Sequence, residues 1–451
     1  MKAELRDNLL ARLAAGEPAF PGIVGFDDTV VPELERALLA GHDLVLLGER
    51  GQGKTRLLRS LTGLLDEWAP VIEGSELNDH PYAPVSVWGQ RTVAQLAEAT
   101  PVAWRHRSER YGEKLATPDT SVGDLIGDVD PIKVAQGRTL GDPETIHFGL
   151  VPRTNRGILA VNELPDLAER IQVALLNVLE ERDIQIRGYQ LRLPLDLLVV
   201  ASANPEDYTN RGRIITPLKD RFGAEIRTHY PLALEDEVAL IGQEALLSWD
   251  GTLGDPVVPA HLVEVIARYT RAVREAPQVD QRSGVSARFA IAAVETLAAS
   301  AVRRAARTGE AAVARVCDLP SVVPASRGKV EFEDTEEGRE FEVLGHLLRR
   351  AVAQTFRGHL AGVDLSALQA KFDGGTTVIA GDEVPAADLL RQLGTVPGLA
   401  QLLERLGVPD GAESPGQAAA AVEFALEGLH LNRRLAKQGP DTRADGKTIY
   451  G

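Results

Sequence analysis

The hydrophobic and polar positions of this chain follow different patterns in its two halves. In the first half, short apolar runs occur at 43–47, 158–161, 197–203 and 225–230. Runs of this length and composition are typical of strands buried on both faces of a sheet. Strands that alternate with helices predict a parallel α/β domain, and the purely helical pattern from about residue 234 predicts a helical region after it.

The remaining elements are predicted from periodicity and breaker residues. Helices are expected at 2–15, 30–40, 57–68, 167–180, 234–247, 260–275, 285–306, 338–360, 365–372, 386–406 and 418–436. The stretch 184–193 alternates apolar and polar residues around a glycine, which predicts a β-hairpin. The weak pattern of 71–116 predicts an irregular insertion with a short strand. The Pro/Ser-rich stretch 320–329 predicts a break, and the polar stretch 437–451 predicts a disordered tail.

Composition narrows the class of protein. The 451 residues are 44% hydrophobic and 25% charged, which fits a soluble protein of two or three domains. The net charge of −16 weighs against general nucleic-acid binding. The single cysteine, Cys317, excludes an intrachain disulfide and a cysteine-based structural zinc site. The first residues lack signal-peptide features, and no apolar run approaches the roughly 20 residues of a membrane span, so we expect a cytoplasmic protein without membrane contact.

One stretch carries a specific chemical signal. Directly after the first apolar run, the motif G-x-x-x-x-G-K-[ST] is matched by Gly48, Glu49, Arg50, Gly51, Gln52, Gly53, Lys54 and Thr55. In such a P-loop the backbone N–H groups wrap phosphates, Lys54 reaches the β- and γ-phosphates, and the Thr55 hydroxyl coordinates Mg²⁺. The sequence therefore predicts that ATP and Mg²⁺ bind here. Ile23 and Val24, shortly before the motif, are either a pocket for the nucleotide base or a simple packing loop.

Polar residues follow two of the later apolar runs. Asn162 and Glu163 end the run at 158–161, and Asn204 follows the run at 197–203. A strand of this kind, downstream of a P-loop, brings a carboxylate beside Mg²⁺ and the attacking water of an ATPase. These residues are therefore the predicted second half of a nucleotide site.

This order of motifs resembles the AAA+ ATPases of the magnesium-chelatase I-subunit and MoxR-like branch. The resemblance runs from about Phe20 to Ala306 and is most specific over Gly123–Asn162 and in the hairpin before Asn204. It implies a P-loop parallel-sheet AAA+ core with a helical lid. The implied domains are an N-terminal helix at 1–19, the α/β domain at 20–231, the lid at 232–319, a helical extension at 320–436 and the tail at 437–451.

The resemblance also implies roles for individual residues. Glu163 is implied as the catalytic base and Asn204 as the sensor that helps to hold the attacking water. Arg221 is implied as the arginine finger presented to a neighbouring subunit, with Arg213 and Arg156 as alternatives.

Two further features take roles from the same resemblance. Arg288 is implied as a second sensor that links the lid to the phosphates. The hairpin at 184–193 is either the insertion that contacts substrate or partner, or a structural ribbon.

One position departs from the family pattern, which has Asp-Glu where this chain has Asn162-Glu163. Asparagine accepts hydrogen bonds from Mg²⁺-bound water but carries no negative charge, so we expect weaker Mg²⁺ binding and a slow but active ATPase. The alternative is a nucleotide-bound scaffold with little hydrolysis.

The resemblance implies a ring, most often a hexamer, that remodels a partner protein bearing a von Willebrand A domain. A motor subunit for metal insertion into a tetrapyrrole is the second hypothesis. A nucleic-acid remodeller is a third hypothesis, which the acidic net charge disfavours.

Overall fold

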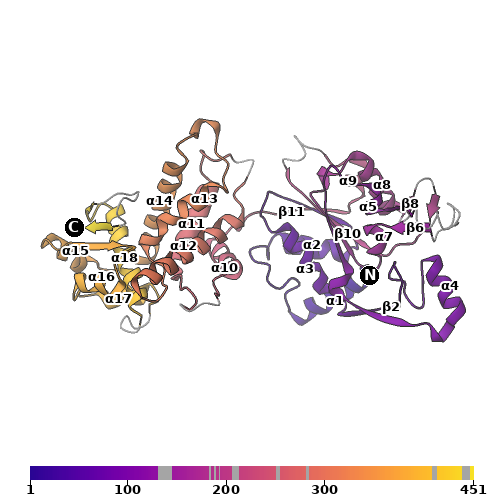
Figure 1. The fold of residues 1–451 in the computed structure, drawn as a ribbon, viewed down its shortest axis with the longest axis horizontal. Coiled ribbons are helices and arrows are strands. Elements are labelled where there is room, and N and C mark those ends of the chain that lie inside the picture. The colour runs from indigo at the N-terminus through magenta and orange to yellow at the C-terminus, as the bar shows by residue number, and fades with distance from the viewer. Residues whose placement is uncertain are drawn as a thin grey trace. The chain divides into compact units, whose positions relative to one another are not determined.

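The structure of the protein is a computed structural model, which describes residues 1–130, 145–181, 184–186, 189–191, 193–205, 213–249, 254–280, 284–408, 414–438 and 447–451. The chain divides into two compact units, unit 1 from Met1 to Tyr230 and unit 2 from Pro231 to Gly451 (Figure 1). Two hydrophobic cores lie in unit 1 and one lies in unit 2.

A five-stranded sheet forms the centre of unit 1, with the strand order β11-β1-β10-β7-β4. Its strands are β1 (Leu44–Leu47), β4 (Tyr111–Leu115), β7 (Ile158–Asn162), β10 (Leu198–Ala203) and β11 (Ala224–Arg227). All neighbouring strands run parallel, which confirms the predicted parallel α/β fold. Because parallel strands end at the same edge of a sheet, the residues that follow β1, β7 and β10 gather there.

Helices cover both faces of this sheet, and alternate strand residues enter two different cores. Leu44 and Leu46 pack with α1 (Lys2–Ala15), α2 (Val30–Leu39), α3 (Lys54–Ser60) and η1 (Leu61–Leu64). Val45 and Leu47 pack on the other face with α5 (Val122–Leu125), α7 (Leu150–Arg153), α8 (Glu169–Glu181) and α9 (Thr216–Arg221). Figure 1 shows α2 and α3 on one side of β10 and α7, α8 and α9 on the other.

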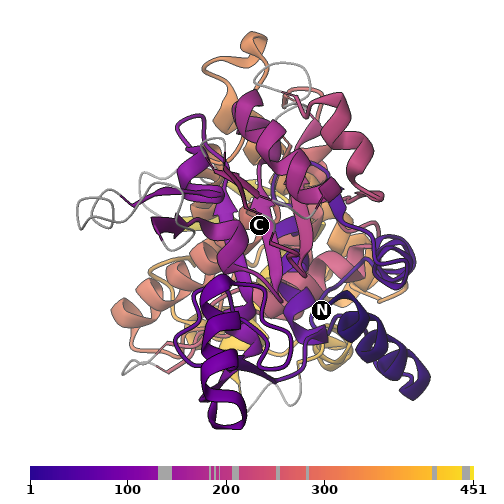
Figure 2. The same ribbon diagram turned by 90° about the vertical axis from the view of Figure 1, so that its right-hand side faces the viewer.

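The smaller elements of unit 1 form three antiparallel pairs and a few short helices. The pairs are β2 (Trp68–Ile72) with β3 (Val102–His106), β5 (Gly127–Val129) with β6 (Ile146–Phe148), and β8 (Ile184–Ile186) with β9 (Tyr189–Leu191). The last pair confirms the predicted hairpin, of which residues 187, 188 and 192 lie outside the described residues. The short helices are α4 (Val87–Leu96), η2 (Ala97–Ala99), η3 (Arg107–Arg110) and η5 (Leu164–Asp166). α4 lies at the periphery of the unit (Figure 1, Figure 2).

Two predictions for unit 1 were wrong. The helix expected at 57–68 ends at Ser60, and Trp68 begins β2, where it pairs with His106 of a strand far along the chain. The stretch 71–116 is not an irregular insertion, because it ends in β4, the edge strand of the main sheet. β4 carries Glu113 and Lys114, and an edge strand tolerates such charges because one side faces solvent.

Unit 2 is mainly helical and has a single core that extends from Ile241 to Tyr450. Its helices are α10 (Leu234–Glu244), α11 (Ala260–Arg274), α12 (Ala287–Thr308), η7 (Val316–Ser321), α13 (Val322–Arg327), η8 (Asp334–Glu336), α14 (Glu340–Leu360), α15 (Ser366–Asp373), α16 (Ala386–Leu393), α17 (Leu399–Arg405) and α18 (Pro415–Leu431). The residues of α18 from Ala418 to Leu429 are buried, so this helix is the centre of the core. α14 packs so closely on α18 that a Cβ at Gly428 would lie 1.9 Å from the Phe356 ring.

Three predictions for unit 2 were wrong. The break at 320–329 is occupied by η7 and α13, which pack into the core. The helix at 386–406 is two helices, separated at Gly394 and Gly398, which both have positive φ. The predicted tail is ordered where it is described: β13 (Lys437–Gln438) and β14 (Lys447–Tyr450) form a sheet with β12 (Val378–Gly381). Tyr450 is buried there, which a polar tail pattern does not reveal.

The lid and the C-terminal extension implied by the resemblance share one hydrophobic core. Residues of both stretches, from Leu262 to Leu429, pack into the same cluster. Among the helices of the described ranges, none is long and apolar enough to cross a lipid bilayer.

Candidate active site

The P-loop lies between β1 and α3, and Thr228, directly after β11, packs against it. Gly51 and Gly53 have φ values of 73° and 75°, a left-handed conformation that favours glycine. A Cβ at Gly48 would lie 2.0 Å from the Thr228 hydroxyl, so the strand and the loop approach as closely as glycine permits. Thr228 Oγ1 donates a hydrogen bond of 2.8 Å to Gln52 Oε1. Backbone and side chains therefore hold the loop in its curved shape.

Lys54 is buried and surrounded by oxygen atoms. Its ammonium donates to the carbonyl oxygens of Gly48 (2.5 Å) and Glu49 (2.8 Å) and to Asn204 Oδ1 (2.8 Å). Phosphate oxygens are acceptors of the same class and carry more negative charge. The first turn of α3 contains no acidic residue, which would repel an anion. These features fit a nucleotide triphosphate.

The polar residues predicted after β7 and β10 do meet. Asn204 Nδ2 donates to Glu163 Oε2 at 2.6 Å, while Asn204 Oδ1 accepts from Lys54. One asparagine thus connects the P-loop lysine to the candidate base. Glu163 has a φ of 55°, which is uncommon for a residue other than glycine and concentrates at functional sites. The Glu163 backbone N–H donates to Ser202 Oγ at 3.3 Å, which helps to fix this turn.

Asn162 is held by two neighbours. Its Nδ2 donates to Glu113 Oε1 at 2.7 Å, and its Oδ1 accepts from Ser202 Oγ at 3.1 Å. Glu113 also accepts two hydrogen bonds from Arg59, at 2.8 and 3.0 Å. Sequence reasoning missed Glu113 because β4 was not recognised as a strand of the main sheet. The local signal was weak, because Gly112, Glu113 and Lys114 separate the two apolar positions of this strand, Tyr111 and Leu115.

The protein groups near the expected metal position are oxygen donors without a dense cluster of charge. Among the described residues, no group of three or more histidine, cysteine, aspartate or glutamate side chains gathers as a metal-binding set. Mg²⁺ in nucleotide sites usually keeps several waters and binds few protein ligands besides the phosphates. The hydroxyl of Thr55 and the amide oxygen of Asn162 fit such a site.

The three candidate finger arginines lie in different surroundings. Arg221 ends α9, is 39% exposed, and binds Glu180 Oε1 at 2.7 Å. This hydrogen bond raises the pKa of Arg221 above its usual value. Arg213 is exposed. Arg156 is half-buried and donates to the carbonyl oxygens of Pro70 (2.6 Å) and Asn78 (3.3 Å), so its guanidinium holds its own chain together. These contacts give Arg156 a structural role in its own chain, and its role as a finger stays a prediction.

Three predicted site residues remain predictions. Ile23 and Val24 are half-buried, and Ile23 packs on the core that contains α3. Both therefore satisfy the packing alternative as well as the base pocket. Arg288 is exposed in the first turn of α12, in unit 2. Its place relative to the P-loop is not described.

Three features define a P-loop ATPase core of the AAA+ type: the parallel order of the strands, the P-loop, and the polar residues Asn162, Glu163 and Asn204. Comparison with known proteins agrees. A family model, the sigma-54 interaction domain, matches residues 138–221. The magnesium-chelatase 38 kDa subunit of Rhodobacter capsulatus is 30% identical over 51% of this chain and 61% of its own length. Magnesium-chelatase subunit ChlI of Guillardia theta is 29% identical over 41% of this chain and 50% of its own length.

A solved complex of the magnesium-chelatase subunits BchI and BchD is 21% identical, with a TM-score of 0.37, over 71% of this chain and 98% of the matched chain. Similarity at that level carries no argument about function. The relation to the AAA+ ATPases of the magnesium-chelatase I-subunit branch, predicted from the motifs, is confirmed by the sequence relatives. The chain spans about half to three fifths of the length of the curated relatives named here.

Proposed function

We propose that this protein hydrolyses ATP, and that it uses the energy as a ring to remodel a partner protein. The observation that carries the proposal is the hydrogen-bonded chain from Lys54 through Asn204 to Glu163. It joins the residue that binds the terminal phosphates to the residue that activates water. A protein that only bound nucleotide would have no need for this link.

Each residue has a separate task in hydrolysis. Glu163 accepts the proton of the attacking water, because it is the carboxylate at the end of β7 beside the P-loop. Asn204 holds the Glu163 carboxylate through its Nδ2 and senses Lys54 through its Oδ1. When the γ-phosphate takes the Lys54 ammonium, Asn204 Oδ1 loses that donor and becomes available to the water. Mg²⁺, when bound through Thr55, neutralises charge that develops on the phosphates.

A neighbouring subunit is required to complete the site. Arg221 lies at the end of α9 and is partly exposed. Its guanidinium pairs with Glu180 of the same chain, an exposed pair of the kind that contributes little energy and exchanges easily. In a ring, most often of six subunits, Arg221 leaves Glu180 and stabilises the transition state of the adjacent nucleotide. The family resemblance supports a partner with a von Willebrand A domain.

A second function is favoured by the relatives. Because both curated relatives are magnesium-chelatase subunits, the chain is alternatively the motor subunit of a metal-insertion complex on a tetrapyrrole. A nucleotide-bound scaffold is the alternative suggested by Asn162. A role on nucleic acid, the third hypothesis from the sequence, is disfavoured by the net charge of −16.

The test of hydrolysis is the Glu163→Gln variant. Glutamine keeps an oxygen that accepts from Asn204 but no longer accepts a proton. We expect unchanged binding of a fluorescent ATP analogue and a loss of about 10²–10⁴-fold in Mg²⁺-dependent phosphate release. Glu169→Gln, which changes an exposed carboxylate at the start of α8, is the matched control and keeps full activity. Wild-type protein that releases no phosphate, with its partner present, would establish the scaffold instead.

Affinity purification from native cells separates the partner hypotheses. Recovery of a von Willebrand A-domain protein alone supports remodelling, and recovery of a large tetrapyrrole-binding subunit supports metal insertion. ATPase activity that rises only when DNA is added supports the nucleic-acid role.

A further inference from the structure

The missing charge at Asn162 has a local replacement. We infer that Glu113 supplies the negative charge of the metal site and positions the Asn162 amide, so that the acidic residue has moved from β7 to the adjacent strand β4. The inference rests on the proposed ATP hydrolysis. It concerns a residue that acts on the metal through its neighbour, since the contact that the structure shows is with Asn162.

Sheet geometry places the two side chains together. β4 and β7 pair in parallel, with Glu113 opposite Ala160 and Leu115 opposite Asn162. Paired residues point to the same face of a sheet, and Ala160 lies in the core that contains α3. Glu113 and Asn162 therefore project toward the helix of the P-loop, where Thr55 lies in the first turn.

The hydrogen bonds determine which end of the Asn162 amide faces which neighbour. Of the two ends of the Asn162 amide, only Nδ2 can donate to the Glu113 carboxylate. The Ser202 hydroxyl, which accepts from the Glu163 N–H, donates to Oδ1. This arrangement keeps Oδ1 as an acceptor for a donor such as metal-bound water. Partners that orient a ligand in this way typically change metal affinity 10–100-fold when mutated.

The same contact explains why position 162 is an amide. With aspartate at 162, two carboxylates would stand at the 2.7 Å that now separates Glu113 Oε1 from Asn162 Nδ2, and like charges at that distance repel strongly. The pair of Asn162 and Glu113 carries one negative charge, as an aspartate beside a neutral residue would. The negative charge of the site therefore lies on β4 instead of β7.

Arg59 shares the Glu113 carboxylate but does not cancel its role. It lies four residues after Thr55, on the same side of α3, and its side chain is 63% exposed. An exposed ion pair of this kind is worth about 0–1 kcal/mol. Arg59 Nη2 donates to the same Oε1 that accepts from Asn162, but solvent and a bound cation compete readily with this exposed pair.

The test is a charge-exchange cycle read out by metal binding. Mn²⁺ binding is measured by electron paramagnetic resonance in the presence of the non-hydrolysable analogue AMP-PNP. Glu113→Gln is expected to weaken Mn²⁺ binding about 10–100-fold, and Asn162→Asp alone to bring no gain. The double variant, which returns the charge to position 162, is expected to recover affinity to within about threefold of wild type. Glu109→Gln, an exposed carboxylate on η3, is the control.

The outcomes separate this inference from the proposed function. If wild type binds AMP-PNP and Mn²⁺ but Glu113→Gln behaves like Glu109→Gln, the role of Glu113 is refuted and ATP binding stands. If the double variant stays as weak as Glu113→Gln while both fold normally by circular dichroism, the charge exchange is refuted. If wild type binds no AMP-PNP, with or without Mn²⁺, both proposals fall.

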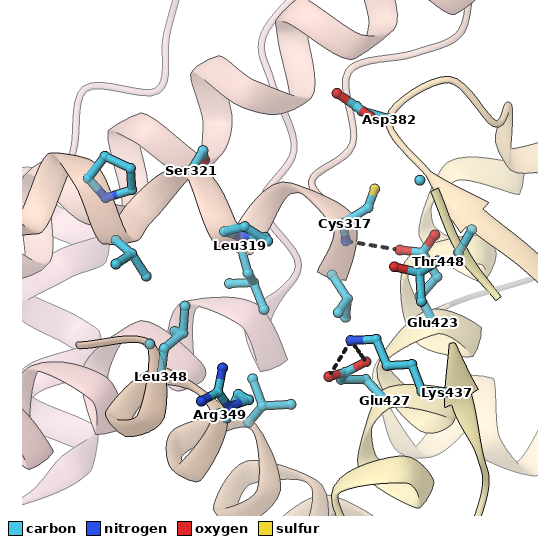
Figure 3. Close-up of a pocket in the computed structure, with 18 of the residues that line it drawn as sticks. Cys317, Leu319, Ser321, Leu348, Arg349, Asp382, Glu423, Glu427, Lys437 and Thr448 are labelled. Atoms are coloured by element: carbon cyan, nitrogen blue, oxygen red, sulfur yellow. Dashed lines mark hydrogen bonds and ion pairs between the residues drawn. The ribbon is translucent and has the colours of Figure 1, made fainter. Parts of the chain in front are cut away.

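A separate cavity lies inside unit 2, far along the chain from the P-loop. Its volume is about 740 Å³, which is in the range of small-molecule sites. Figure 3 shows Leu348 and Arg349 of α14 on one side of the cavity and Glu423 and Glu427 of α18 on the other. Cys317 of η7 lies above them. The cavity thus has an apolar wall and an acidic wall.

The acidic wall is organised by buried contacts. Glu427 accepts from Lys437 Nζ at 3.0 Å and from the Tyr450 hydroxyl at 2.6 Å. Glu423 accepts from the buried guanidinium of Arg315. Each of the four carboxylates that line the cavity has a cationic partner: Glu342 pairs with Arg339, Asp382 with Arg303, Glu423 with Arg315 and Glu427 with Lys437. Burial raises the pKa of the Cys317 thiol.

Discussion

The ion pair between Arg315 and Glu423 offers a quantitative test of how unit 2 is held together. Both side chains are essentially inaccessible, with exposures of 0% and 1%. Arg315 Nε and Nη2 donate to Glu423 Oε1, and Nη1 donates to the Val384 carbonyl oxygen at 2.8 Å. The other carboxylate oxygen, Oε2, accepts from the Cys317 backbone N–H at 3.3 Å. One carboxylate therefore connects η7 to α18 at the centre of the core.

The perturbation is Glu423→Gln, which keeps the volume and removes the charge. The amide oxygen still accepts from Arg315, but the amide NH₂ then faces the Cys317 N–H, so two donors meet. The guanidinium is left with Glu310, at 3.7 Å, as its nearest carboxylate. Breaking one side of a buried pair in this way costs about 3–5 kcal/mol of unfolding free energy. For a unit the size of residues 231–451, this corresponds to a fall in Tm of about 6–20 °C.

The assay is urea unfolding followed by circular dichroism, with differential scanning calorimetry for the Tm. The matched control is Asp388→Asn, which removes the charge of an exposed pair between Asp388 and Arg391 in α16. That pair is worth less than about 1 kcal/mol. If Glu423→Gln costs no more than Asp388→Asn, the burial argument is refuted and the carboxylate is not a structural centre of unit 2.

Three further predictions concern other parts of the molecule. Gly157→Ala places a Cβ 2.2 Å from the Arg110 carbonyl oxygen, which is rigid backbone. We therefore expect the free energy of unfolding, measured in urea, to fall by about 1–3 kcal/mol. The control Gly242→Ala, where the new Cβ of a helical residue meets open space, is expected to be neutral or stabilising. Burial, with His359 nearby, lowers the pKa of His261 to about 3. As the pH falls, the unfolded chain therefore binds this proton before the folded chain does, and the free energy of unfolding decreases below the pKa of an unfolded histidine. Relative to His261→Leu, wild type should lose about 2 kcal/mol between about pH 7.5 and 5, and an identical pH dependence of the two proteins would contradict this. Arg221→Ala is expected to bind ATP and to lose about 10³–10⁵-fold in turnover, and retained hydrolysis would move the finger to Arg213 or Arg156.

Much of the candidate site was readable from the chain because its signals are local. The P-loop is a contiguous motif, and Lys54 contacts Asn204 as the parallel order of the strands requires. Glu163 and Asn204 were found because each directly follows an apolar run that forms a strand. Their contact was predictable because parallel strands end at one edge.

Residues whose role depends on distant neighbours were not readable. Glu113 contacts Asn162 across 49 residues, and its strand carries charges that hide it from a search for apolar runs. The contacts of Arg156 with the carbonyl oxygens of Pro70 and Asn78, far away in the chain, could not be predicted from the sequence either.

The amino-acid sequence by itself determined the parallel core, the P-loop, the hairpin and most helices, because periodicity and contiguous motifs record the local structure of the backbone. Tertiary structure alone decided three things: that β4 closes one edge of the sheet, that Glu113 lies beside Asn162, and that the last residues pair with β12 to bury Tyr450. Each depends on pairing between segments far apart in the chain. Such pairing is selected by the free energy of the assembled core, which no local pattern contains.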